Sequence, residues 1–187
     1  MVETIVLAVP VSDRELQSMK ILLNLLERFG RKRIILDRIH QEPYLTRYYL
    51  FLKDRKWFPF NFFLHNFHKG DPDDLHDHPW CYFTIILKGG YWEHIPLRSM
   101  NGAVVGSTRE WRGPGHIRFR KAEDLHWLEL EKDEDGNEIP CVSLFLMGKK
   151  RKEWGFVDWF PATEKNYDNA GYRWVHNETY LKERQNG

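Results

Sequence analysis

Residues 70–80 read GDPDDLHDHPW, and this short acidic stretch carries the pattern that decides the fold. It places His76 and His78 one residue apart. In an extended chain alternate side chains point to the same face, so the two imidazoles project together from Cα atoms about 6.5 to 7 Å apart. Imidazoles at that separation can converge on one ion, with bonds of about 2.0 to 2.1 Å to a zinc-like metal. The stretch therefore predicts two ligands of a metal site.

A third ligand has to come from elsewhere in the chain, and His126 is the best candidate. It begins the run HWLELE and alternates with Leu128 and Leu130 on one face, while the two glutamates take the other. The apolar face of a half-buried strand is the inner one, so His126 is expected to point into the protein. An ordinary core histidine remains the alternative, and His116 is the second candidate for the third ligand.

Short β-branched and aromatic runs surround the histidines, separated by Gly, Pro, Asp and Asn. Many short strands at even spacing are typical of a β-sandwich or barrel. The expected strands are residues 33–39, 44–52, 60–68, 80–87, 91–95, 103–111, 116–120, 126–131, 141–147 and 154–160. No repeat or linker divides them, so residues 1–187 are expected to form one domain. Its barrel spans residues 33–160 and its C-terminal extension residues 161–187.

One helix is expected before the strands, over residues 12–29. Ser12 and Glu15 form an S-x-x-E capping box at its start, and Gly30 stands where a C-cap belongs. Apolar residues recur at helical spacing between them, from Leu16 to Phe29. Such a stripe predicts packing of the helix against the outside of the main body, and not a cofactor site.

The composition excludes several classes of protein. Aromatic residues make up 15% of the chain, which is too much apolar surface for a disordered protein. The net charge of +1 gives no basic field for nucleic acid. Cys81 and Cys141 are too few for a disulfide framework, and free thiols are expected. With no secretory signal and no apolar run of about 18 residues, we expect a cytoplasmic protein without a membrane partner.

The spacing around the histidine pair resembles a known family motif. Gly70, His76 and His78 are followed by Gly89, and their spacings match the first motif of the cupin superfamily, G-x5-H-x-H-x3-4-E-x6-G. The run GPGHIRF, continued to His126, resembles a stretched form of the second cupin motif. With LHDHPW, GGYWEH, LHWLEL and EWGF, the chain is similar to a group of small bacterial and phage cupins. The resemblance implies an all-β fold, a double-stranded β-helix (jelly roll), behind one N-terminal helix.

The sequence departs from the motif at its glutamate, which is a metal ligand in cupins. That position falls on Tyr82 with the shorter spacing and on Phe83 with the longer one. Tyr82 shares the parity of the histidine pair, so it is expected to face the same cavity. Three neutral imidazoles resemble the three-histidine iron site of thiol dioxygenases, with open positions for substrate and oxygen.

Other polar residues near the motif could supplement the histidines. The candidates are Glu93 and the acidic loop residues Asp73, Asp74 and Asp77. A solvated turn is the alternative, and Asp77 could also orient an imidazole. His65 could line the cavity or simply pack in the sheet. The basic run over residues 149–152 is expected to form a solvated hairpin tip.

These features predict a metal-dependent cupin enzyme that acts on a small molecule, with an iron-dependent dioxygenase as the leading sub-class. It would hold one divalent ion, Fe before Zn, Ni or Mn, with Tyr82 as a catalytic hydrogen-bond donor. Two alternatives remain: a non-catalytic module that binds a sugar or other metabolite, and a sugar-nucleotide epimerase or isomerase with a histidine base. A homodimer is also expected, because jelly-roll cupins expose a sheet edge that the apolar segment 5–11 could pair across.

Overall fold

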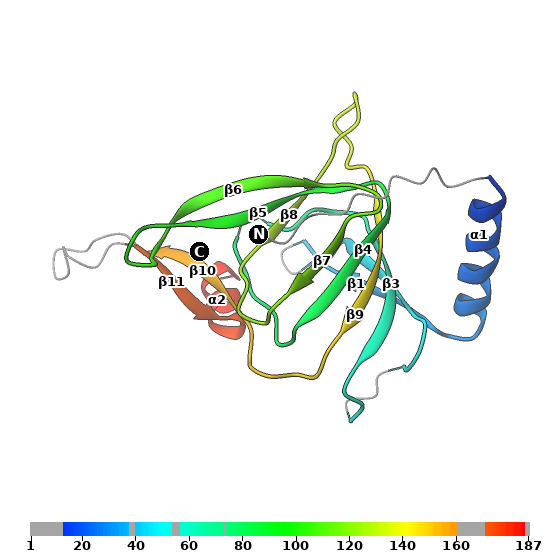
Figure 1. The fold of residues 1–187 in the computed structure, drawn as a ribbon, viewed down its shortest axis with the longest axis horizontal. Coiled ribbons are helices and arrows are strands. Elements are labelled where there is room, and N and C mark those ends of the chain that lie inside the picture. Colours follow the sequence, from blue (N-terminus) through cyan, green and yellow to red (C-terminus); the bar gives the residue numbers. More distant parts are fainter. Residues whose placement is uncertain (1–12, 38–39, 54–56, 73, 161–170, 186–187) are drawn as a thin grey trace.

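The computed structural model describes residues 13–37, 40–53, 57–72, 74–160 and 171–185 (Figure 1). Its elements are α1 (Asp13–Arg28), β1 (Lys32–Leu36), β2 (Pro43–Tyr49), β3 (Asn61–Phe67), β4 (Tyr82–Lys88), β5 (Tyr91–Arg98), β6 (Val104–Arg112), β7 (Ile117–Arg120), β8 (Trp127–Leu130), β9 (Cys141–Met147), β10 (Gly155–Phe160), β11 (Gly171–His176) and α2 (Asn177–Gln185).

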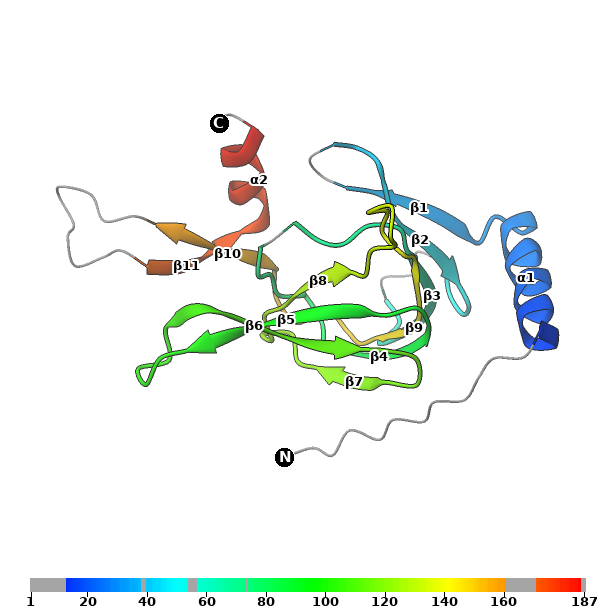
Figure 2. The same cartoon turned by 90° about the horizontal axis from the view of Figure 1, so that it is seen from above.

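The strands form antiparallel sheets. One sheet has the order β1-β2-β3-β9-β4-β7, a second has the order β6-β5-β8, and β10 pairs with β11. Strands distant in sequence become neighbours, since β9 lies between β3 and β4. Helix α1 stands at one end of the molecule, and the β10–β11 hairpin with α2 stands at the other (Figures 1 and 2). The predicted all-β jelly roll behind one N-terminal helix is confirmed.

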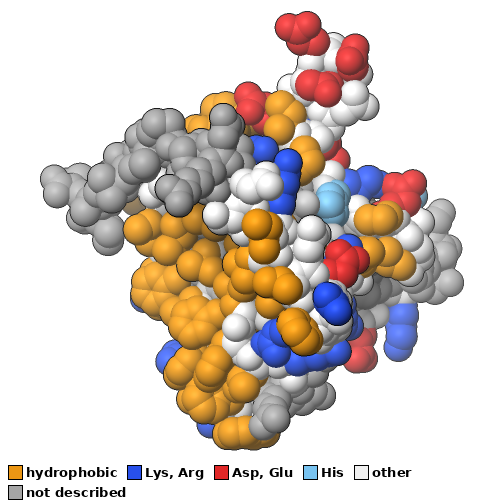
Figure 3. Space-filling view, turned by 90° about the vertical axis from the view of Figure 1, so that its right-hand side faces the viewer, with side chains coloured by type: hydrophobic (Ala, Val, Ile, Leu, Met, Phe, Trp, Pro, Cys, Tyr) orange, Lys and Arg blue, Asp and Glu red, His pale blue; other side chains and the backbone are white. Residues whose placement is uncertain are grey.

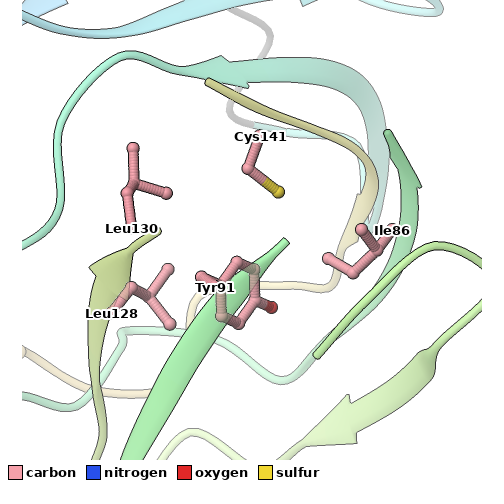
Figure 4. Packing of buried hydrophobic residues seen from close by; sticks show 5 residues of the cluster. All are labelled: Ile86, Tyr91, Leu128, Leu130 and Cys141. Atoms are coloured by element: carbon pink, nitrogen blue, oxygen red, sulfur yellow. The ribbon is translucent and has the colours of Figure 1, made fainter. Parts of the chain in front are cut away.

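The core lies between the two larger sheets (Figure 4). Tyr91 of β5 and Leu128 and Leu130 of β8 meet Ile86 of β4 and Cys141 of β9, and all five are buried. Alternation along each strand places these side chains on the inner face. Burying one large apolar side chain contributes about 1.5–3 kcal/mol, so this layer holds the sheets face to face.

Every predicted strand occurs, with ends shifted by a few residues. The C-terminal extension contains more structure than expected, since it supplies β11 and α2. Its polar composition gave no periodic signal. One signal was present in Asn177, a favoured residue at a helix start, whose side-chain oxygen accepts a hydrogen bond from the backbone N–H of Glu178 at 2.8 Å.

The core packing expected of the α1 stripe is wrong. The helix ends as its glycine predicts: Gly30 has φ 64°, and the N–H of Arg31 bonds the carbonyl of Leu26 at 2.8 Å. Yet Leu22 is 46% exposed and Phe29 74% exposed. The helix contacts β2 but stands beside the sheet, so only part of its apolar face is covered in the described protein (Figure 2). Segment 5–11 lies outside the described residues.

No helix in the described ranges is long and apolar enough to cross a bilayer. The cytoplasmic location stays a prediction.

Asp77 fastens the histidine stretch to the C-terminal hairpin. One carboxylate oxygen accepts from the backbone N–H of Gly155 at 2.8 Å, and the other accepts from Trp174 Nε1 at 2.8 Å and from the ammonium of Lys152. Asp77 is 1% exposed. It is therefore neither in a solvated turn nor bonded to an imidazole. The basic run 149–152 is not the predicted hairpin tip, because β9 and β10 belong to different sheets, although residues 149–151 are exposed.

We expect Asp77→Ala to lower the free energy of unfolding by about 3 kcal/mol, because three buried or half-buried donors lose their acceptor together. Urea denaturation of the metal-free protein measures this. Glu153→Ala is the control, since Glu153 is an exposed partner of Lys150 and its loss should leave the midpoint unchanged. Equal midpoints for the two variants would contradict the structural role of Asp77.

Candidate metal centre

The backbone sets His76 and His126 directly opposite each other. The N–H of each bonds the carbonyl of the other at 3.0 Å, as in one hydrogen-bonded pair of an antiparallel ladder. Residues in such a pair lie about 5.5 Å apart at Cα with their side chains on one face. On its other side His76 bridges to Phe156 of β10. The histidine stretch is therefore a minimal strand between β8 and β10.

The structure brings the three predicted histidines together. One nitrogen from each of His76, His78 and His126 lies within 4.8 Å of the other two, and the Nε2 atoms of His78 and His126 are 2.8 Å apart. Two nitrogens that each lie about 2.1 Å from one ion are about 3.0 Å apart when the bonds meet at a right angle. The cluster therefore fits a divalent ion, and a His76/His78/His126 site could hold one.

Hydrogen bonds to Nδ1 fix two of the rings. Nδ1 of His76 lies 3.2 Å from the carbonyl oxygen of Asp74, and Nδ1 of His126 lies 3.2 Å from a carboxylate oxygen of Glu93. Both acceptors call for a proton on Nδ1, which leaves the lone pair of each neutral ring on Nε2. Carboxylate and carbonyl acceptors behind a histidine are the usual support of metal ligands.

Glu93 is the centre of a buried charge cluster. One of its oxygens accepts from Arg112 Nε at 2.8 Å, and the other accepts from Arg120 Nε at 3.0 Å as well as from His126. Burial alone would raise the pKa of Glu93, but the hydrogen bond from His126, together with the charge and the hydrogen bond of Arg120, outweighs it and holds the pKa well below its ordinary range. Glu93 is 2% exposed, so it is not part of a solvated turn. Its oxygens face Arg112, Arg120 and Nδ1 of His126, and it is not in the three-nitrogen group.

Tyr82 points at the histidine cluster from β4. Its hydroxyl lies 3.0 Å from Nε2 of His126, and its ring centroid lies 5.0 Å from that of His78. Burial, and after it the charge of Glu93, raises the pKa of Tyr82 well above its ordinary value. The phenol therefore keeps its proton and can donate a hydrogen bond beside the ligand nitrogens.

The remaining candidates lie apart from the cluster. His116 is 5% exposed, and burial is the main cause that lowers its pKa, but it is not in the three-nitrogen group. The hydroxyl of Tyr180 in α2 donates to the carboxylate of Asp74, and Asp73 lies outside the described residues. Cys81 does not line the cavity, and it is a free thiol.

The three histidines lie at a cavity of about 370 Å³ between the sheets. Small-molecule sites occupy volumes of this order and are mostly apolar with a few polar groups. The cavity follows that description, because aromatic and aliphatic side chains form most of its wall. His65 lines it, and so does Phe156 of the predicted strand 154–160. Tyr180 of α2 also lines it, although the sequence predicted residues 161–187 only as an extension.

The comparisons with known proteins bear on the fold of this chain and not on its chemistry. No protein-family model matches this sequence, and no curated protein matches it. Similar solved structures include the polyketide cyclase RemF from Streptomyces resistomycificus, with 18% identity over 66% of this chain and 76% of that one at a TM-score of 0.44. A second is hydroxypropylphosphonic acid epoxidase from S. wedmorenis, with 12% identity over 64% of this chain and a TM-score of 0.43.

A third similar structure is a cupin superfamily protein from Desulfitobacterium hafniense, with 13% identity over 62% of this chain and 84% of that one at a TM-score of 0.39. The chain spans only 56% of the epoxidase's length. The similar structures thus include a cupin, which is the fold that the first motif implies. At these identities the likeness concerns the fold alone.

Sequence reasoning missed the part that Glu93 plays. Tyr91 and Glu93 share one face of β5, and the burial of Tyr91 points that face inward. Parity alone could have placed the carboxylate inside. The arginines that neutralise it come from β6 and β7, and the cross-strand register that brings them there is not written in local sequence.

We expect Glu93→Gln to weaken metal binding at least about tenfold, because the neutral amide supports the His126 ring less well than the carboxylate does. A competition titration against a chelator measures the affinity. Glu129→Gln is a matched control: Glu129 bonds Nε2 of His94 at 2.7 Å on the other face of the same sheet. Equal affinities in the two variants would show that Glu93 does not support the metal ligand.

Proposed function

We propose that this chain is a metal-dependent enzyme of cupin type that acts on a small molecule, with an iron-dependent dioxygenase reaction as the first candidate. One observation carries the proposal: three imidazole nitrogens converge within 4.8 Å of one another at a mainly apolar cavity. In His76 and His126 the other ring nitrogen, Nδ1, donates a hydrogen bond to an oxygen acceptor. Metal-binding histidines in proteins are usually oriented in this way.

His76, His78 and His126 would hold the ion through ring nitrogens. When bound, a divalent first-row ion supplies a Lewis acid with open coordination positions. Imidazole suits Fe, Zn, Ni and Cu, so the donor set does not choose among them, and the metal found after purification follows supply as well as affinity. Fe is our first candidate, with Zn, Ni or Mn as alternatives.

The chain's own groups prepare the rest of the site. Tyr82 holds a proton at a hydroxyl 3.0 Å from Nε2 of His126, where it can donate to a substrate oxygen. Phe145 stacks on Tyr82 at 4.7 Å between ring centroids and keeps that wall dry. Water exclusion strengthens each polar contact inside, because the local dielectric falls.

We expect protein purified without a polyhistidine tag to carry close to one equivalent of a first-row divalent ion. His76→Ala, His78→Ala and His126→Ala should each lose most of it, because two imidazoles hold such an ion weakly. Elemental analysis measures the content, and His116→Ala is the control that should keep it. Protein that neither contains nor takes up metal would overturn the proposal.

Tyr82→Phe separates the possible roles of the phenol. If the Tyr82 hydroxyl donates to the substrate, its loss should lower turnover about tenfold or more while the metal content stays unchanged. Loss of metal would instead make the phenol oxygen a ligand. Oxygen uptake by the metal-loaded protein with candidate substrates measures turnover, and ligand binding without any turnover would favour the non-catalytic binding module.

We also propose that the chain forms a homodimer through the outer face of its six-stranded sheet. Cross-strand pairing aligns Phe83 of β4 with Phe119 of β7, and Ile85 with Ile117, on the face opposite the cavity. Phe83, Phe119 and Ile117 are 45%, 46% and 53% exposed. Figure 3, which faces the end of the molecule that carries α1, shows further hydrophobic side chains gathered at the surface. Monomers rarely expose broad apolar patches, and a two-fold contact buries the same patch on both subunits.

We expect light scattering at micromolar protein to give twice the chain mass of 22.6 kDa. Phe119→Asp should give the monomer, because the dimer would have to bury two unpaired carboxylates. Val105→Asp, at a 60% exposed position on β6, is the control and should remain dimeric. A monomeric wild-type protein would contradict the proposal.

A further inference from the structure

A second polar group lines the cavity apart from the three histidines. Register places Arg47 of β2 opposite His65 of β3, and His65 opposite Ser143 of β9. The three side chains thus form one row across three adjacent strands, and all three line the cavity. We call Arg47, His65 and Ser143 the polar row.

The proton of His65 faces away from Arg47. Nε of Arg47 donates to Nε2 of His65 at 3.1 Å, so Nε2 is the acceptor and a neutral ring carries its proton on Nδ1. Burial, and after it the charge of Arg47, lowers the pKa of His65 well below its ordinary value, so the ring is neutral. His65 is 3% exposed, and its Nδ1 has no partner among the described residues.

Ser143 also has a buried polar atom without a partner among the described residues. Its side chain is fully buried, and its hydroxyl oxygen has no hydrogen-bond partner in the described part of the chain. A buried polar atom without a partner costs about 1–3 kcal/mol, and folded proteins contain few of them. Two such donors in neighbouring register positions of one cavity wall call for a common acceptor.

An aromatic wall joins the polar row to the histidine cluster. The ring of His65 stacks on Phe145 at 4.8 Å, Phe145 stacks on Tyr82 at 4.7 Å, and the hydroxyl of Tyr82 reaches Nε2 of His126. A ligand anchored at the polar row can therefore lie along this wall with its far end at the three histidines. Its body has to be apolar or aromatic to match the wall.

We infer that the polar row binds the carboxylate of a small organic acid whose reacting end lies at the histidine cluster; this assignment of a substrate class rests on the function proposed above. The N–H of His65 and the hydroxyl of Ser143 are two donors for two carboxylate oxygens, and Arg47 adds a positive charge beside them. Hydrogen bonds to a charged acceptor are about twice as strong as those to a neutral one.

Three carboxylates also line the cavity, and each accepts hydrogen bonds from groups of its own. Asp37 accepts from the backbone N–H groups of His40 and Glu42. Asp71 accepts from the hydroxyl of Tyr44 at 2.5 Å and from the backbone N–H of Leu128 at 2.8 Å. Asp74 accepts from Tyr180. These carboxylates are held by local donors, whereas Nδ1–H of His65 and the Ser143 hydroxyl are donors with no acceptor among the described residues.

Benzoate is a suitable probe, because it pairs a carboxylate with an aromatic body, and benzamide is its neutral counterpart. We expect metal-free protein to bind benzoate in a ligand-detected NMR titration, and to bind benzamide at least about tenfold more weakly. Ser143→Ala should weaken benzoate about tenfold without lowering the melting temperature, because the hydroxyl it removes has no partner within the protein. His65→Phe keeps the ring stack and should weaken benzoate similarly. Thr84→Val removes another hydroxyl from the cavity wall and should change little.

Three results would overturn the inference: no benzoate binding below about 10 mM, equal affinity for benzamide, or unchanged affinity in Ser143→Ala. Benzoate binding that requires added metal would also overturn it, since the carboxylate would then be held by the ion. The metal proposal fails separately, through elemental analysis, because the benzoate titration uses metal-free protein.

Discussion

The pair of backbone hydrogen bonds between His76 and His126 is the contact on which the site depends. It makes His76 of the acidic loop an isolated bridge residue, the shortest possible strand. It also places the side chains of His76 and His126 on one face, whatever their rotamers. His78 then follows by alternation. The candidate ligands are therefore positioned by ladder geometry, which is stiffer than an arrangement of loop side chains. The same stretch is fastened on its other side by the bridge to Phe156 and by Asp77, so the C-terminal hairpin belongs to the site that it flanks.

Burying Glu93 is costly, and the fold bears this cost beside the histidine cluster. A carboxylate that is 2% exposed needs compensation, which Arg112 and Arg120 provide. Buried ion pairs contribute little net stability, so the cluster is poorly explained as a fold stabiliser. It is better explained by His126: a fixed negative charge behind Nδ1 holds the tautomer and directs the Nε2 lone pair to the cavity.

Much of the candidate site could be predicted from the local pattern of the sequence. The parity of His76, His78 and Tyr82, and the alternation of His126 with two leucines, predicted which side chains meet, because strand period is a property of the backbone. Register could not be predicted in the same way. The approach of Arg112 and Arg120 to Glu93 depends on which residues of β5, β6, β7 and β8 face each other. Helix α1 shows the opposite limit: its apolar stripe is real, but periodicity states only that a face is apolar and not what covers it.

The cavity has donors at both ends and an apolar wall between them, and this polarity limits what it can admit. At one end Tyr82 keeps its proton; at the other, His65 is neutral with its proton on Nδ1, and Ser143 has a free hydroxyl. Leaving the last two unsatisfied makes the empty fold less stable than an apolar wall would, by an amount that a matching acceptor would recover on binding. His65 and Ser143 lower stability at positions that strand register places in the cavity wall. Selection for a ligand explains this better than the needs of folding do. Under the proposed function, the wall of β3 and β9 would recognise the ligand's acceptor, and the histidine cluster would act on the ligand's other end.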